Sequence, residues 1–269
     1  MDQAQQIKKR LAELQNRGTF GGYTVYTDFL GLEEQSLLAE VTGPRSVPAY
    51  GGFGGAERVM AAFGPAPEPA DYPITCLHIV PKQEKFAEEL THRDYLGTLM
   101  GLGLERRVLG DILPCGKGAY LFCTAGMAEY IETQLHRVRH TEVTCTRADN
   151  LPPHLLPQPE DREVIVPSLR LDVLVGAVYN LSRSSADKFF LQQKVFVNGR
   201  CIENRAHTVQ PGDKISVRGH GRFIAGAPLR RTKKDRLVVP VEVYYIKPIA
   251  KGAVPASTAP FFFYAIGAL

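Results

Sequence analysis

The sequence predicts an α+β protein with a helical N-terminal segment, a middle domain that alternates strands with helices, and a basic C-terminal domain. Two proline-rich stretches divide the 269 residues, and between them short apolar runs alternate with segments of helical periodicity. Charge then separates the last part: residues 168–236 contain 14 Lys and Arg against 5 Asp and Glu, a net charge of +9, and the remainder carries −5. A segregated basic region is typical of a protein that binds a polyanion.

The proline-rich stretches set the expected boundaries: a helical segment at 1–67, a middle domain at 73–150, a stiff linker at 151–167, a basic domain at 168–245 and a tail at 246–269. No window holds about 18 consecutive apolar residues, so neither a transmembrane helix nor a membrane partner is expected. The N-terminus carries charges throughout and lacks the apolar core of a secretory signal, which predicts a cytoplasmic protein.

The cysteines and histidines favour neither a metal site nor a disulfide framework, and no cofactor is predicted. The 5 cysteines are odd in number, and none belongs to a Cys-x-x-Cys pair. Cys76, Cys123 and Cys145 lie in apolar runs and are expected to be small buried side chains. His136 and His140 have no acidic partner placed to complete a site, so we expect a basic group at a helix end.

In the N-terminal segment, apolar residues at helical spacing predict a first helix that ends at Gly18, and a second helix is expected around residues 32–42. The glycine-rich residues 51–55 are expected to precede a third helix beginning near Ala56. No Lys-Ser/Thr follows these glycines, which disfavours a nucleotide-binding loop. A turn, or a local anion contact assisted by Arg58, is favoured instead.

The middle domain reads as strand, helix, strand, strand, helix, strand. The expected elements are strands at 73–80, 108–115, 119–124 and 141–148, with helices at 91–103 and 125–138. This order is that of the split β-α-β, or ferredoxin-like, arrangement. Leu96, Leu99 and Met100 are expected to face the core. Tyr120 and Phe122 follow a Lys-Gly pair, as in some RNA-binding domains, but we expect them to pack under the helices.

The basic domain begins with two short helices. Arg-Leu-Asp at residues 170–172 opens the first helix, Asn180 ends it, and Ser182 caps the second. A hairpin with an Asn-Gly turn at residues 198–199 follows, and Pro-Gly at residues 211–212 turns the chain into a final strand.

Four motifs of this region resemble the S4-type RNA-binding domain when they are taken in order. They are Arg-Leu-Asp at 170–172, Ser-Arg-x-x-Ala at 182–186, Val-x-Val-Asn-Gly at 195–199 and Pro-Gly-Asp at 211–213. The family commonly has Gly where the second helix meets the strand, and this chain has Gln193, which is the one visible departure. Further stretches between residues 50 and 245 look like the bacterial YlmH-type S4 proteins.

The YlmH-type resemblance implies a helical segment, a ferredoxin-like domain and an S4 domain. It also implies binding of structured RNA on the ribosome, with the large subunit, ribosomal RNA and transfer RNA as partners in quality control of stalled translation. The residues themselves predict a surface that contacts RNA backbone. The candidate contact residues are Arg170, Ser182, Arg183, Ser184, Lys188, Lys194, Asn198, Arg200, Arg205, Lys214, Arg218, His220 and Arg222.

Two alternatives to a non-enzymatic RNA-binding protein stay open at the level of sequence. The first is an RNA-modifying enzyme guided by the S4 domain, for which Asp111 is the best lone carboxylate, although a structural Asp is favoured. The second is a scaffold, associated with cell division, whose acidic N-terminal segments bind a protein partner. Co-sedimentation with ribosomal subunits distinguishes the scaffold from the ribosome-binding hypothesis.

Overall fold

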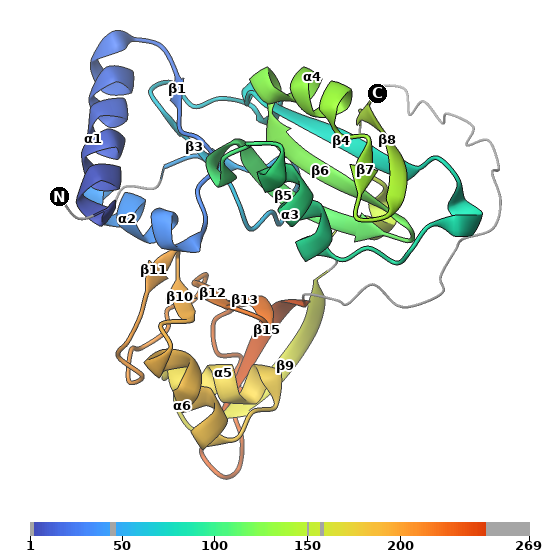
Figure 1. The fold of residues 1–269 in the computed structure, drawn as a ribbon. Helices are drawn as coiled ribbons and strands as arrows, with labels where there is room; N and C mark the ends of the chain where they lie inside the picture. The colour runs from blue at the N-terminus through green and yellow to red at the C-terminus, as the bar shows by residue number, and fades with distance from the viewer. Residues whose placement is uncertain (1–2, 44–46, 150, 157–158, 246–269) are drawn as a thin grey trace, which may run out of the picture.

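The computed structural model describes residues 3–43, 47–149, 151–156 and 159–245, and the predicted tail lies outside them (Figure 1). The protein is a mixed α/β structure with helices and antiparallel sheets, as the sequence predicts. Three sheets, of three, five and seven strands, follow one another along the chain. None of the described helices is long and apolar enough to cross a membrane.

The N-terminal segment combines two helices with a small sheet of order β1-β3-β2. Its elements are α1 (Gln3–Gly21), β1 (Val25–Tyr26), α2 (Leu32–Thr42), β2 (Ala49–Tyr50) and β3 (Met60–Phe63). The prediction that α1 ends at Gly18 is wrong. Gly18 lies inside the helix, where a Cβ would overlap the backbone of Phe63, so this glycine allows close packing of α1 on β3.

The helix expected from Ala56 is also absent, because this stretch leads into β3. All four residues of β3 are buried, and they pair with β1 on one side and β2 on the other. The sequence Met-Ala-Ala-Phe suits a helix by intrinsic propensity. Pairing and burial on both faces override that propensity here.

The five-stranded sheet of the middle region has the order β5-β6-β4-β8-β7. Its elements are β4 (Ile74–Pro81), α3 (His92–Gly101), β5 (Leu109–Cys115), β6 (Gly118–Thr124), α4 (Ala125–Gln134), β7 (Arg137–Val138) and β8 (Thr141–Ala148). Helices α3 and α4 pack on one face, where Leu77, Ile79 and Leu121 belong to their core. Met100, expected in this core, is 45% exposed, and Tyr95 occupies the buried position instead.

Tyr120 and Phe122 point to the face of this sheet opposite the helices, so the expectation that they pack under α3 and α4 is wrong. Phe122 is 2% exposed and belongs to a core with Phe29, Phe53 and Met60 of the N-terminal segment. Tyr120 stacks on His78 with ring centroids 4.3 Å apart. The N-terminal segment therefore takes the place that a second layer of helices would have.

The C-terminal lobe, residues 159–245, packs two helices against the seven-stranded sheet. Its elements are β9 (Glu160–Val166), α5 (Leu171–Tyr179), α6 (Arg183–Leu191), β10 (Val195–Val197), β11 (Arg200–Cys201), β12 (Lys214–Val217), β13 (Gly221–Ala225), β14 (Arg230–Arg231) and β15 (Leu237–Tyr245). β9 lies within the stretch expected to be a linker. It pairs with β15, since Val164 and Val166 bury against the same core as Val239 and Val241.

Candidate nucleic-acid interface

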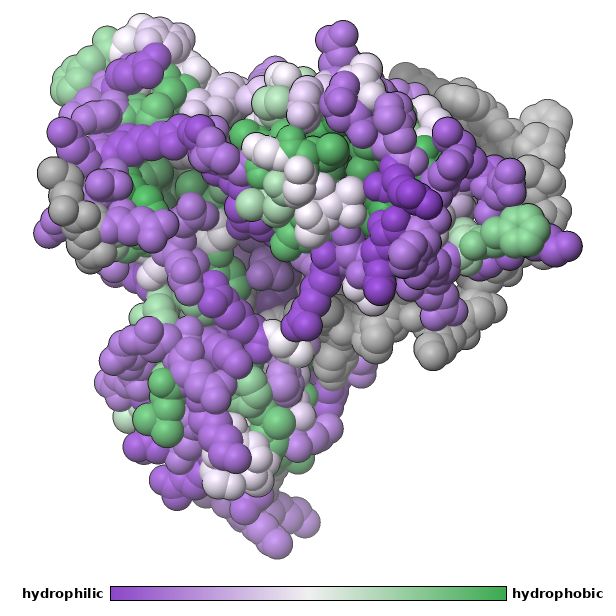
Figure 2. All heavy atoms as spheres, viewed as in Figure 1, coloured by the Kyte–Doolittle hydropathy of each residue, from purple (hydrophilic) through white to green (hydrophobic). Residues whose placement is uncertain are grey.

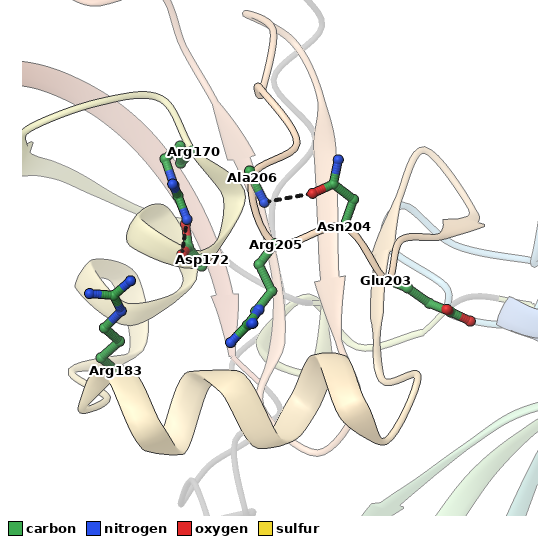
Figure 3. A pocket seen from close by; sticks show the side chains of 7 residues that line it. All are labelled: Arg170, Asp172, Arg183, Glu203, Asn204, Arg205 and Ala206. Carbon is green, nitrogen blue, oxygen red and sulfur yellow. Dashed lines mark hydrogen bonds and ion pairs between the residues drawn. The ribbon is translucent and has the colours of Figure 1, made fainter.

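The α5–α6 pocket is an open depression of ≈ 390 Å³ in the C-terminal lobe (Figure 3). It is lined by Arg170, Asp172, Arg183, Glu203, Asn204, Arg205 and Ala206. The loop after β11 is held against α5, because Leu171 N donates to His207 O at 2.9 Å and Asp172 N to Arg205 O at 3.2 Å. Three of the sequence-predicted arginines, from three different segments, therefore line one space.

Arg170 and Asp172 form a two-bond ion pair in the wall of this pocket. Arg170 Nε donates to Asp172 Oδ1 at 3.0 Å and its Nη2 to Oδ2 at 2.7 Å. The hydrogen bond from Arg170 lowers the pKa of the Asp172 carboxyl, which is 8% exposed and also accepts the N–H of Val173. The planar guanidinium is fixed in orientation, with its remaining donors available to a ligand.

Arg183 and Arg205 differ in their surroundings. Arg205 pairs with Asp187 at 2.8 Å, and its side chain is 52% exposed. Arg183 is exposed and forms no ion pair with any residue that the structure describes. Its charge helps to lower the pKa of the nearby Asp172 carboxyl, but its donors are not engaged in an ion pair, which suits an anionic ligand.

The start of α6 adds neutral donors beside Arg183. Ser182 is the predicted cap: its Oγ accepts the N–H of Ser185 at 3.2 Å. The hydroxyls of Ser184 and Ser185 lie 3.1 and 2.8 Å from that oxygen. Backbone N–H groups at a helix start favour a negative charge, so this end of α6 can contact a phosphate together with Arg183.

Arg200 and Arg218 point away from the pocket and contact α2. Arg200 Nη2 donates to Ala39 O at 2.7 Å, and Arg218 pairs with Glu33 at 2.9 Å. Between them, Cys201 N donates to Ser36 Oγ at 2.9 Å. An acidic residue of the N-terminal segment thus binds a basic residue of its own chain, and α2 covers the edge strand β11.

His220 and Arg222 are also packed within the protein. Arg222 lies over the ring of Tyr244 at 4.5 Å, and burial lowers the pKa of its guanidinium. The ring of His220 makes edge contacts with Tyr179 and Phe189, with centroids 5.3 and 4.7 Å away. Both side chains have internal packing roles in addition to their predicted RNA contacts.

The remaining predicted residues lie around the hairpin and along α6. Asn198 donates to Asp213 at 2.7 Å and accepts the N–H of Lys214 at 3.0 Å, so its side chain fixes the hairpin turn to β12. Lys188 and Lys214 are exposed, and Lys194 is half-buried. Their RNA contacts stay a prediction.

Gln193, the departure from the S4 pattern, adopts the left-handed conformation that glycine favours, with φ 52°. It follows the end of α6, and its Nε2 donates to Glu203 at 2.6 Å. The backbone keeps the conformation suited to glycine, and the added side chain joins α6 to the loop after β11.

The glycine-rich loop before β3 binds an anion of its own chain. The N–H groups of Glu57 and Arg58 donate to the two carboxylate oxygens of Asp111 at 2.6 and 3.1 Å. Arg58 in turn donates to Leu109 O and Phe29 O at 2.8 and 2.9 Å. Asp111 therefore holds the N-terminal segment against β5, which is a structural role.

Asp111 is expected to make stability depend on pH, since burial raises its pKa from 3.8 to about 6. The carboxyl binds its proton more tightly in the folded state, so its contribution to the free energy of unfolding is full below about pH 4. As pH rises through about 6, the free energy of unfolding therefore falls by about 2–3 kcal/mol. Because the asparagine in Asp111→Asn does not titrate, the free energy of unfolding of the unaltered protein minus that of the variant, measured in urea, should fall by this amount between these pH values. A constant difference would contradict the assignment.

In the part of the chain that the structure describes, no cluster of three or more His, Cys, Asp or Glu side chains is placed to bind a metal ion. Burial raises the pKa of the Cys123 and Cys145 thiols to about 12, so these thiols stay protonated.

The comparisons with known proteins match the middle region and the C-terminal lobe to two family models. Residues 67–151 match the family described as "Putative RNA-binding domain in YlmH", and residues 160–218 match the C-terminal domain of mitochondrial transcription rescue factor 1. Ribosome-associated protein quality control protein P2 of Bacillus subtilis is 33% identical over 225 residues, which cover 80% of this chain and 86% of that protein. A solved structure, cell division protein ylmH from Streptococcus pneumoniae, matches with a TM-score of 0.45 and 24% identity, over 55% of this chain and 92% of that one.

Proposed function

Because this chain belongs to the YlmH family, we propose that it binds structured RNA without catalysing a reaction, and that its target is RNA of the large ribosomal subunit. The C-terminal lobe then acts as an S4-type domain, and the middle region as a ferredoxin-like domain. Binding takes place in the cytoplasm during quality control of translation, with transfer RNA as a second candidate contact. The name of the Bacillus subtilis relative supports the ribosome as the partner.

The observation that carries this proposal is the convergence of Arg170, Arg183 and Arg205 around the α5–α6 pocket. An oriented guanidinium, a guanidinium that forms no ion pair with the described residues and a helix start lie together, and each is a group that binds phosphate. The pocket is open and polar, which suits the backbone of a large ligand. The enzyme alternative has no such support, because both oxygens of Asp111 are already bound to backbone N–H groups.

Co-sedimentation tests the proposed target. The full chain should pellet with purified large subunits at about 50 mM salt and be released at about 200 mM, because phosphate neutralisation displaces counterions. Small subunits at the same RNA mass serve as the control and should pellet much less protein. If equal amounts of protein pellet with both subunits, the large subunit is not the specific target. If the amount bound does not change with salt concentration, binding does not depend on phosphate contacts.

A further inference from the structure

A second basic site lies outside the set of residues predicted from the sequence. Residues 230–236 read Arg-Arg-Thr-Lys-Lys-Asp-Arg, with five basic residues and one acidic residue in seven. They comprise β14 and its connection to β15, and Arg230 pairs with Val238 in the antiparallel register. The sequence shows this basic run directly. It is not among the predicted contact residues, and the last of the four S4-type motifs ends at residue 213.

The connection between these strands is a defined turn, here called the basic turn and comprising residues 232–236. Thr232 N donates to Arg236 O at 2.8 Å, and Asp235 N donates back to Thr232 O at 2.9 Å. Arg236 N also donates to Thr232 Oγ1 at 3.2 Å, and Asp235 adopts a left-handed φ of 54°. These bonds fix the backbone from which the side chains of the turn project, so binding does not require the turn itself to become ordered.

The acidic groups near the basic turn are already engaged. Arg230 pairs with Glu163 at 3.0 Å, and Arg231 pairs with Asp235 at 2.7 Å. The other three cations, Lys233, Lys234 and Arg236, are exposed and form no ion pair with the described residues. These three line a shallow depression of ≈ 310 Å³ together with Ile165 and Thr232.

The basic turn lies at the end of the C-terminal lobe that points away from α2, where Figure 1 shows the chain before β15 and Figure 2 shows a hydrophilic surface. Val166 opposes Leu237, the residue directly after the turn, and Arg170 follows Val166 by four residues. Four residues span at most about 14 Å. The turn and the α5–α6 pocket are therefore close enough to contact one RNA molecule.

We propose that the basic turn is a second phosphate-contacting site, which binds the backbone of the same RNA as the α5–α6 pocket. This inference rests on the proposed function and extends its footprint beyond the two helices. RNA fits better than an acidic protein, because two of the three unpaired cations are lysines, which are depleted at protein–protein interfaces. Lysine is also a common phosphate ligand, because its ammonium group acts as a point charge.

The test compares the full chain with a variant that carries Lys233→Gln, Lys234→Gln and Arg236→Gln. Binding to deproteinised large-subunit ribosomal RNA is measured by filter retention across a salt series. The salt slope of the variant should be smaller by two to three, since each lost phosphate contact removes about 0.9. A charge-retaining variant with Lys233→Arg and Lys234→Arg should bind like the unaltered protein.

The possible outcomes separate this inference from the proposed function. If the unaltered chain binds the RNA and the neutralised variant binds with the same slope, the basic turn is not a contact while the proposed function stands. If the unaltered chain itself fails to bind, the proposed function fails. If the variant keeps its RNA affinity but no longer pellets with intact subunits, the turn contacts a ribosomal protein, and the proposal is overturned in that form.

Discussion

Phe122→Ala is expected to lower the free energy of unfolding by about 3–5 kcal/mol, which is the usual range for removing a buried phenylalanine. Phe122 is 2% exposed and lies between the central strand β6 and the N-terminal segment. Its ring packs on Phe53 with centroids 5.0 Å apart. Gly52 lies so close that an added Cβ would overlap the Phe122 ring, and its φ of 99° suits glycine alone. The truncated side chain leaves a cavity that this tight backbone cannot fill.

Urea unfolding measures the loss, and Phe86→Ala is the matched control. Phe86 is 75% exposed, so its truncation should change stability by no more than about 0.5 kcal/mol. Limited proteolysis gives a second readout: the Phe122→Ala protein should be cut in the N-terminal segment before the middle region. A loss below about 1 kcal/mol would show that Phe122 does not join these two parts.

The sequence predicted the parts of the fold in which local pattern and tertiary environment agree. Residues 74–81 and 118–124 alternate or run apolar, and they form the two central strands β4 and β6. Ser182 caps α6 and Asn180 ends α5 in the left-handed conformation, because these residue types favour such positions by themselves.

The sequence failed where a partner far along the chain decides the structure. Gly18 stays helical because α1 packs on Phe63, and β3 is a strand because β1 and β2 pair with it. The candidate site shows the same limit. Arg183 and Arg200 look alike as exposed basic residues of one module, yet α2 accepts a hydrogen bond from Arg200 and none from Arg183. The contact between α2 and the C-terminal lobe therefore decides which arginines stay available for RNA.

The strongest effect on RNA affinity is expected from Arg183→Gln combined with Arg205→Gln. Both side chains line the α5–α6 pocket, and Arg183 has no ion-pair partner in the described parts of the chain. Loss of two phosphate contacts should reduce the salt slope by about two and the affinity by roughly tenfold to a hundredfold at about 0.1 M salt. Filter binding with large-subunit ribosomal RNA measures both quantities, and thermal unfolding verifies that the variant is folded.

The matched control removes the same two charges from the face that contacts α2, through Arg200→Gln and Arg218→Gln. These side chains bind Ala39 O and Glu33, so their loss should weaken the contact between α2 and the hairpin without changing the salt slope. If both pairs reduce the slope equally, Arg200 and Arg218 also contact RNA phosphates through the donors that α2 does not engage, and the interface extends beyond the α5–α6 pocket. If neither pair changes the slope, the α5–α6 pocket is not the contact. The comparison therefore tests the orientation of the interface with variants of identical charge.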